Sequence, residues 1–285
     1  MATLRQLRTR VASIKNIQRV TNAMQLVAAA RVRRAQEAIL AARPYAQKLD
    51  QVLRHVSGGV DPEQHPLLRE RSVERVVIAV VTADRGLCGG FNANICRHAL
   101  MELQAYENKE IQLVSIGRKG HNFFRSRDYT VSKAHTDVFK ELAFGQATII
   151  AQDLTRRFLS NEVDCVQVVF SEFVSLAQQA PVSVQLLPIV SQQTESDEQP
   201  DEYIFEPEPS RLLDTLVPRH VSFQIWRMLL ESNAGEQAAR MMAMDNATKN
   251  AGDLIDELTR EMNKERQSSI TLELMDILGG AEAVA

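Results

Sequence analysis

The residues best placed to do chemistry form a glycine-rich loop, Thr82–Asn92, with the sequence TADRGLCGGFN. The loop follows an apolar run typical of a buried strand and precedes a helical pattern, which is where phosphate-binding loops lie. It does not match GxGxxG, and GxxxxGK[ST] occurs nowhere in the chain. A nucleotide loop is one interpretation. The favoured interpretation is a tight strand-to-helix turn that exposes Arg85.

Residue types that bind metals or act as nucleophiles are present without the spacing that such chemistry needs. The six histidines form no HxxxH or HExxH pair, and the chain has no CxxC and no GxSxG. Cys88, Cys96 and Cys165 are odd in number and widely spaced, which favours buried free thiols in a reducing compartment. We therefore expect no catalytic residue, no metal site, no cofactor and no enzymatic activity of the chain's own.

The middle of the chain alternates between strand and helix patterns. Strands are predicted at 75–81, 111–116, 164–170 and 182–187, and helices at 92–106 and 145–160. Apolar runs such as VVIAVV are typical of strands buried on both faces, and the strand–helix–strand order implies right-handed crossovers. We expect a Rossmann-like α/β domain over 58–210 with a mostly parallel sheet, ending in an acidic linker at 192–210.

Each end of the chain predicts one very long helix, over residues 1–57 and 211–285. Thr3 and Gln6 form a possible capping box, Pro44 is a possible kink, and Gly58-Gly59 ends the first pattern. Two apolar stripes follow steps of three and four: Leu4, Leu7, Val11, Ile14, Ile17, Val20, Met24 and Val27; and Met241, Met244, Thr248, Ala251, Ile255, Leu258 and Met262. Helices of this length exceed an ordinary domain, so we expect an antiparallel coiled coil that projects from the α/β domain. A bundle folded back on itself is the alternative.

Charge is distributed unevenly along the chain. Residues 1–57 hold eleven Lys and Arg against two acids, a net +9, whereas residues 195–209 hold seven acids and no base. The basic segment is interpreted as a site for an acidic protein partner or as a solvated helix face, with nucleic acid or lipid as weaker alternatives. No apolar run is long enough to span a bilayer or to act as a secretory signal.

Three stretches carry a resemblance to a known family. They are SIKNIQRVTNAMQLVAAA at 13–30, DRGLCGG at 84–90, and EQAARM with AMDNATKNA at 236–251, extended by RQ at 266–267. These resemble, in order, the first helix, the central motif and the last helix of the γ subunit of F-type ATP synthases. The resemblance covers essentially the whole chain.

The resemblance implies a non-catalytic rotor shaft that couples proton-driven rotation of the membrane c-ring to ATP synthesis in a hexamer of α and β subunits. It implies the ε subunit as a further partner, no nucleic acid, no direct lipid insertion, and a peripheral place on the cytoplasmic face of the bacterial inner membrane. Arg266, Gln267, Arg85 and Met24 match positions that contact the β subunit, although Met24 is equally well interpreted as coiled-coil core. The alternative function is a Rossmann-like nucleotide-binding protein with helical arms, and a basic scaffold on nucleic acid is a third.

The same resemblance predicts two features of the chain's acidic segment and its tail. Chloroplast relatives carry a redox-active cysteine pair near residues 190–205, but Ser191–Tyr203 contains no cysteine, so no thiol switch is expected there. The nearly uncharged tail, Leu278–Ala285, fits an apolar sleeve.

Overall fold

The computed structural model describes residues 3–57, 65–189 and 208–282. In chain order the elements are α1 (Leu4–Ser57), β1 (Arg75–Val81), α2 (Phe91–Ala105), β2 (Glu110–Ile116), α3 (Arg118–Arg125), β3 (Val131–His135), α4 (Phe144–Leu159), β4 (Cys165–Phe173), β5 (Gln179–Leu187) and α5 (Pro209–Glu282). They form two compact units, Met1–Ala29 with Arg240–Ala285, and Ala30–Ala239. The acidic linker predicted at 192–210 lies outside the described residues up to 207, and α5 begins two residues earlier than predicted.

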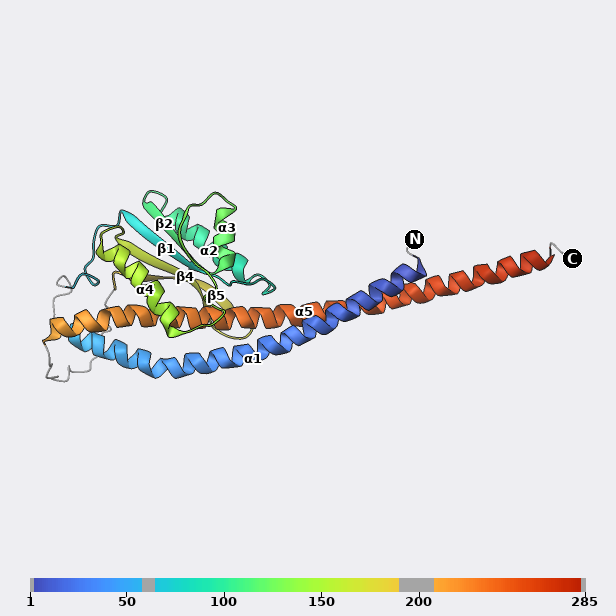
Figure 1. The fold of residues 1–285 in the computed structure, drawn as a ribbon, viewed down its shortest axis with the longest axis horizontal. Helices are drawn as coiled ribbons and strands as arrows, with labels where there is room; N and C mark the ends of the chain where they lie inside the picture. The colour runs from blue at the N-terminus through green and yellow to red at the C-terminus, as the bar shows by residue number, and fades with distance from the viewer. Residues whose placement is uncertain (1–2, 58–64, 190–207, 283–285) are drawn as a thin grey trace. The chain divides into compact units, whose positions relative to one another are not determined.

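The second unit contains a five-stranded sheet in the order β3-β2-β1-β4-β5 (Figure 1). β1 pairs in parallel with β2 and β4, β2 pairs in parallel with β3, and β5 runs antiparallel to β4. The predicted mostly parallel α/β fold is confirmed. The sequence analysis missed α3 and β3, because an eight-residue helix and a five-residue edge strand are too short to show a clear period.

Helices cover both faces of this sheet. Val76, Ile78 and Val80 of β1 pack with α2 and Phe124 of α3, whereas Val77 and Ala79 on the opposite face pack with α4 and the first part of α5. All five side chains are fully buried, which explains why β1 is a continuous apolar run instead of an alternating one. The sheet is thus the middle of three layers.

The two long helices pair in antiparallel fashion, as predicted. In the first unit, Leu7 and Val11 of α1 form a buried cluster with Leu258 of α5. The predicted capping box begins α1: the Thr3 amide donates to Gln6 Oε1 at 2.9 Å, and the Gln6 amide donates to Thr3 Oγ1 at 3.4 Å. In the second unit, the rings of Tyr45 and Phe223 contact each other at a tilt of 50°, with centroids 4.9 Å apart.

The apolar stripe predicted on α1 is wrong after Ile14. Ile17, Val20 and Val27 are 55%, 57% and 53% exposed, so they do not face α5. The positions that do face α5 continue the strict alternation of three and four through polar residues. They are Leu7, Val11, Ile14, Gln18, Thr21, Gln25 and Ala28. The physical reason is the partner helix: the α5 stripe is an unbroken heptad repeat, and a coiled coil keeps both seams in phase.

One glycine fixes the turn between β2 and α3. Gly117 has a φ of 98°, and a Cβ atom there would lie 1.9 Å from the carbonyl oxygen of Thr82. We expect Gly117→Ala to lower the free energy of unfolding of the second unit by roughly 2–4 kcal/mol, because backbone strain and a backbone clash add. Urea unfolding followed by the fluorescence of Trp226, the chain's single tryptophan, measures this.

Gly145→Ala is the matched control, since a Cβ at Gly145 in α4 meets nothing within 4 Å. Alanine there is expected to be neutral or to stabilise by up to about 1 kcal/mol. Equal urea midpoints for the two variants would contradict the strain at Gly117.

Candidate functional site

The loop after β1 uses its polar groups to hold the α/β domain together. Asp84 Oδ1 accepts the amides of Arg118 at 3.0 Å and Asp137 at 2.9 Å, and Asp84 Oδ2 accepts the amide of Phe139 at 3.2 Å. These amides belong to the start of α3 and to the segment after β3. One carboxylate therefore connects the segments that follow β1, β2 and β3.

This arrangement bears directly on the nucleotide interpretation of the loop. The start of a helix after a parallel strand is where a dinucleotide-binding fold places a phosphate. Here the Asp84 carboxylate already accepts the Arg118 amide at the start of α3. A phosphate at the start of α3 would have to displace a carboxylate that bonds to three amides, whereas no side chain in the described ranges caps the start of α2, the helix that follows the loop. The favoured interpretation, a tight turn that exposes Arg85, matches the exposed Arg85 side chain.

The same loop carries an unusual apolar residue. Leu87 has a φ of 65°, in the left-handed region, and its side chain is 64% exposed. Asn92 supports the loop from the first turn of α2, where its Oδ1 accepts the Ala83 amide at 2.9 Å. Arg85 and Leu87 are therefore presented to solvent by a loop with little freedom to move.

The cysteines are buried free thiols, as the sequence predicted. Burial raises the pKa of Cys96 and of Cys165 to about 11, so almost none of either thiol is ionised at neutral pH. His135 lies 3.8 Å from Asp153, and burial lowers the pKa of His135 more than the carboxylate raises it. A neutral imidazole and protonated thiols fit packing roles better than acid–base or nucleophilic chemistry.

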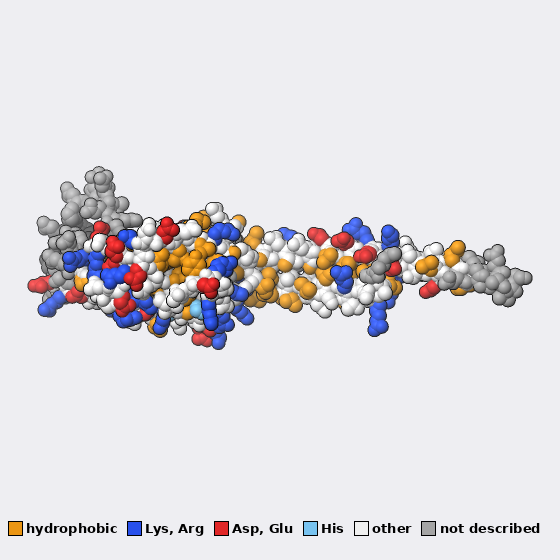
Figure 2. All heavy atoms as spheres, turned by 90° about the horizontal axis from the view of Figure 1, so that it is seen from above, with side chains coloured by type: hydrophobic (Ala, Val, Ile, Leu, Met, Phe, Trp, Pro, Cys, Tyr) orange, Lys and Arg blue, Asp and Glu red, His pale blue; other side chains and the backbone are white. Residues whose placement is uncertain are grey.

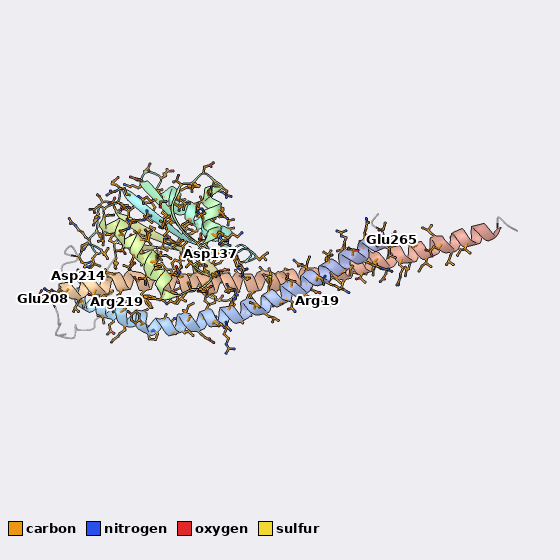
Figure 3. All side chains as sticks on the ribbon, viewed as in Figure 1. Arg19, Asp137, Glu208, Asp214, Arg219 and Glu265 are labelled. Carbon is orange, nitrogen blue, oxygen red and sulfur yellow. The ribbon has the colours of Figure 1, made fainter. Side chains whose placement is uncertain are left out.

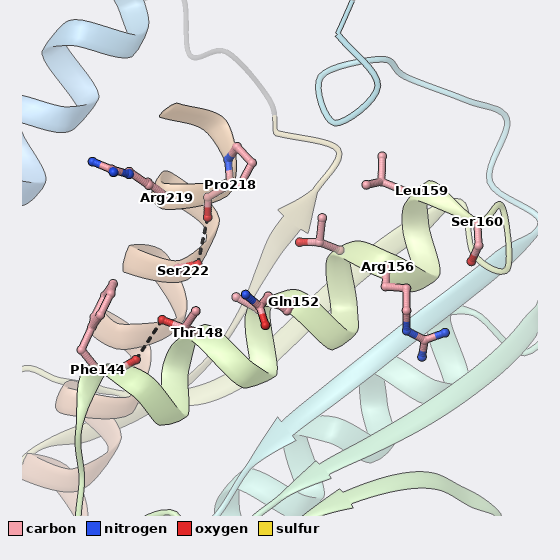
Figure 4. Close-up of a pocket in the computed structure, with 11 residues that line it drawn as sticks. Phe144, Thr148, Gln152, Arg156, Leu159, Ser160, Pro218, Arg219 and Ser222 are labelled. Atoms are coloured by element: carbon pink, nitrogen blue, oxygen red, sulfur yellow. Dashed lines mark hydrogen bonds between the residues drawn. The ribbon is translucent and has the colours of Figure 1, made fainter. Parts of the chain in front are cut away.

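A groove of about 650 Å³ lies between α4 and the first part of α5 (Figure 4). Its hydroxyl groups are used within their own helices: Thr148 Oγ1 donates to the Phe144 carbonyl at 3.1 Å, and Ser222 Oγ donates to the Pro218 carbonyl at 2.9 Å. The groove offers apolar carbon and two arginines at its edges, Arg156 and Arg219. Because the polar groups that line the groove do not converge on one point, the groove resembles a contact surface more than a small-molecule site.

Arg266 and Gln267 lie on the coiled coil where the pairing ends. The contact between Thr21 and Thr248 sets the register, so Leu4, where α1 begins, lies opposite residue 265 of α5. Figure 3 shows Glu265 of α5 close to the beginning of α1. Arg266 and Gln267 are both exposed, and no acid lies three or four residues from Arg266 on its helix. Its positive charge is therefore available to a partner.

Beyond that point α5 continues to Glu282, and within the described ranges no other helix pairs with it there. Large apolar side chains there are exposed by 49–68%: Ile270, Leu272, Leu274, Met275 and Ile277. They are spread around the helix instead of along one stripe, so a single partner helix could not cover them all. An enclosing apolar surface could. The tail predicted at Leu278–Ala285 falls on side chains outside the described residues.

Met24 lies on α1 within the first unit, some distance from the end of the pairing. Its neighbour Gln25 occupies the seam and donates from Nε2 to Asp245 Oδ1 at 3.0 Å, while Met24 stays half-exposed. Residues 245 and 266 of α5 are roughly 30 Å apart along the helix axis at 1.5 Å per residue. Met24 and Arg266 therefore belong to separate contact regions, and Arg85 belongs to the other unit.

The α1 half of the coiled coil has a basic and partly apolar surface. Residues 3–29 hold five Lys and Arg and no acid, whereas residues 240–282 of α5 hold five Lys and Arg and nine acids. Figure 2 shows blue, red and orange side chains along the coiled coil. Arg19, labelled in Figure 3, is one of the exposed cations. An acidic partner with apolar patches would complement this surface.

Two further features are absent from the described residues. No helix in them has the length and the apolarity needed to cross a bilayer. No cluster of three or more His, Cys, Asp or Glu side chains in the same ranges is arranged to hold a metal ion.

Comparisons with known proteins decide the family. Residues 3–284 match the family model described as ATP synthase. The ATP synthase gamma chain of Pelotomaculum thermopropionicum is 46% identical over 287 residues, with both chains covered in full. The chain belongs to the ATP synthase γ chain family. The γ chain of Prosthecochloris aestuarii is also 46% identical, over 100% of this chain and 99% of that one.

Solved structures in this family share the fold at lower identity. A chain of the Euglena gracilis mitochondrial ATP synthase, from a structure of OSCP, F1 and the c-ring, has a TM-score of 0.73 and 19% identity, covering 99% of this chain and 94% of that one. A chain of the Tetrahymena thermophila central stalk and c-ring has a TM-score of 0.60 and 22% identity, covering 80% and 99%. Both likenesses confirm the α/β fold with two long terminal helices.

Sequence reasoning missed the polar residues that make the coiled-coil seam. A signal was present: counting strictly in steps of three and four from Leu7 arrives at Gln18, Thr21 and Gln25. The prediction instead followed the apolar residues one position earlier, Ile17, Val20 and Met24.

The bonds of Asp84 lead to a test of the loop. We expect Asp84→Ala to lower the free energy of unfolding of the second unit by roughly 1–3 kcal/mol, because three amides lose a charged acceptor. Asp137→Asn is the control: it removes the exposed pair between Arg118 and Asp137, at 2.7 Å, at a cost of under about 1 kcal/mol. Trp226 fluorescence in urea reports both variants. A larger loss for Asp137→Asn than for Asp84→Ala would refute the role assigned to Asp84.

Proposed function

We propose that this chain is the central rotor shaft of a proton-translocating ATP synthase. The coiled coil of α1 and α5 sits inside the hexamer of α and β subunits, and the α/β domain bears the contacts with the ε subunit and the c-ring. The chain performs no catalysis itself. It passes rotation between the ring and the catalytic sites of the hexamer. In a bacterium this places it on the cytoplasmic face of the inner membrane, held by the complex and not by a span of its own.

The observation that supports this function best is the unpaired end of α5. A lone helix in water does not expose apolar residues such as Leu272 and Ile277 around its circumference without cost, so this surface calls for an enclosing partner. A smooth apolar sleeve would bury the surface without directional bonds. Such a contact holds the axis in place and still permits the helix to turn.

Polar contacts that transmit torque need a different chemistry. Arg266 and Gln267 lie next to the apolar end, and Met24 and Arg85 are exposed or half-exposed elsewhere on the surface. A guanidinium forms directional bonds to carboxylates, and water replaces such bonds at modest cost when the site is exposed. We assign Arg266, Gln267, Arg85 and Met24 to contacts with the β subunit on these grounds.

Names of similar proteins supply the partners. The relatives are named γ chains of ATP synthase, and the similar solved chains come from structures whose titles name F1, a rotor, a central stalk and a c-ring. The boundaries of three working blocks, 1–57, 58–210 and 211–285, are part of this proposal. The loop after β1, whose carboxylate is committed to three amides, supports a structural role for the α/β domain over nucleotide binding.

A rotation assay tests the function directly. The chain is mixed with an α/β hexamer of the family immobilised on glass, and a bead is attached to an introduced surface cysteine on α2, Met101→Cys, which is 54% exposed. We expect ATP to drive continuous rotation of the bead in one direction. Assembly without rotation, or tight ATP binding to the isolated chain in equilibrium dialysis, would count against a rotor.

Charge reversal at the end of the pairing tests one contact. We expect Arg266→Glu to reduce ATP-driven torque and ATP synthesis in the assembled complex by at least several-fold, because the new carboxylate would face an acidic partner surface. Far-UV circular dichroism of the isolated chain should not change, since the side chain is exposed.

Lys264→Glu is the matched control, an exposed reversal two residues away that points to the other side of the helix. It should leave torque within about twofold of the parent value by the same reasoning. Equal effects of the two substitutions would remove the specific role of Arg266.

A further inference from the structure

The apolar pattern of α1 and its packing differ by one residue over residues 17–28. Apolar side chains occupy Ile17, Val20 and Val27, which we call the outer stripe, and all three are more than half exposed. Gln18, Thr21 and Gln25, each one residue after an apolar residue (Ile17, Val20 and Met24), face α5 and form what we call the polar seam. One residue corresponds to a rotation of about 100° around an α-helix. If burial of apolar area alone set the rotation of α1, the outer stripe would face α5.

Hydrogen bonds hold the polar seam in place. Gln18 Nε2 donates to the Thr248 carbonyl at 3.5 Å, and the hydroxyls of Thr21 and Thr248 lie 2.7 Å apart. Gln25 Nε2 donates to Asp245 Oδ1 at 3.0 Å. Thr21 is 8% exposed, and its hydroxyl also donates to the Gln18 carbonyl of its own helix at 3.0 Å. A turn of α1 would therefore break the bonds of Gln18 and Gln25 to α5 and the contact between the two hydroxyls, while Thr21 would keep its partner within α1. A buried polar pair in a coiled coil commonly specifies one arrangement at a cost in stability.

We propose that the polar seam fixes the rotation of α1 about its own axis so that the outer stripe faces outward, as a docking surface for an apolar protein wall edged with carboxylates. This inference rests on the proposed function, in which the wall is the inner surface of the α/β hexamer. Charge supports that occupant: residues 3–29 provide five cations and no acid, and the first acid of the chain is Glu37. A basic helix that exposes apolar side chains fits such a wall.

The first experiment measures the rotation of α1 in the isolated full-length chain. Ala28 is buried and lies opposite Met241, one heptad from the pair of Thr21 and Thr248. Cysteines at 28 and 241 should form a disulfide with copper phenanthroline, whereas cysteines at 27 and 241 should not, because Val27 points away from α5. The parent chain, whose three thiols are buried, controls for the native cysteines.

The same two pairs are then placed in a chain with Gln18→Leu, Thr21→Val and Gln25→Leu. We expect the yield of the 27–241 disulfide to rise at least fivefold, because the two faces of α1 become equally apolar. The matched control, Thr9→Val, Asn16→Leu and Asn22→Leu, adds similar apolar surface at exposed positions of the same helix and should keep the parent pattern. An unchanged disulfide pattern in the seam variant would overturn the rotational role of the polar seam.

The second experiment measures docking. In a chain with Ile17→Ser, Val20→Ser and Val27→Ser we expect the 28–241 disulfide to persist and the Kd for an α/β hexamer to rise at least tenfold. Met101→Ser with Ile149→Ser, exposed apolar residues in the other unit, should leave the Kd within twofold. Parent-like binding by the outer-stripe variant would overturn the docking role.

The two experiments separate this inference from the function on which it rests. Failure of the parent chain to bind the hexamer at all would refute the proposed function and, with it, the assigned occupant, whereas the disulfide pattern would still decide the role of the polar seam. Tight binding of the parent chain to random-sequence duplex DNA, weakening steeply with salt and lost in the outer-stripe variant, would replace the protein wall by nucleic acid.

Discussion

The structure of the coiled coil depends on the unbroken heptad repeat of α5. Met244, Ala251 and Leu258 are buried at regular steps, and a coiled coil can bury such a seam only if the partner helix keeps the same phase. α1 keeps that phase by placing Gln18, Thr21 and Gln25 against α5 and leaving Ile17, Val20 and Val27 in water. As a result, less apolar area is buried between α1 and α5, and more apolar surface is exposed on the outside of the coiled coil.

In the α/β domain, the loop after β1 uses its carboxylate for hydrogen bonds within the domain. Its fold places the ends of three parallel strands at one edge of the sheet, where many proteins of this architecture bind a phosphate. Here the Asp84 carboxylate bonds to backbone amides from two neighbouring segments. Where other proteins of this architecture bind a ligand, this domain has hydrogen bonds between its own segments. Arg85 and Leu87 are exposed on the loop that these bonds hold in place.

The surfaces left open share a common chemistry. The outer stripe on α1, the unpaired end of α5 and the groove between α4 and α5 are apolar, and lysines or arginines lie near each of them. Contacts of this kind are strong enough to guide a partner, and they include few buried polar bonds that would have to break during movement. A subunit that turns inside its neighbours needs surfaces that combine low friction with a small number of directional contacts.

The sequence by itself determined the existence and length of the long helices, the antiparallel pairing, the parallel sheet and the family. The elements and their pairing follow from local signals: the Thr3–Gln6 cap, the heptads of α5, and the apolar run of β1. The family follows from the resemblance of residues 13–30, 84–90 and 236–251 to known γ subunits. Tertiary structure alone decided which face of α1 meets α5, because rotation is set by Thr248 and Asp245 more than 200 residues away. It also decided the partners of Asp84, since three amides from two distant segments meet its carboxylate only when the strands align. Single-residue choices between competing faces depend on long-range bonds, and a local pattern contains no information about them.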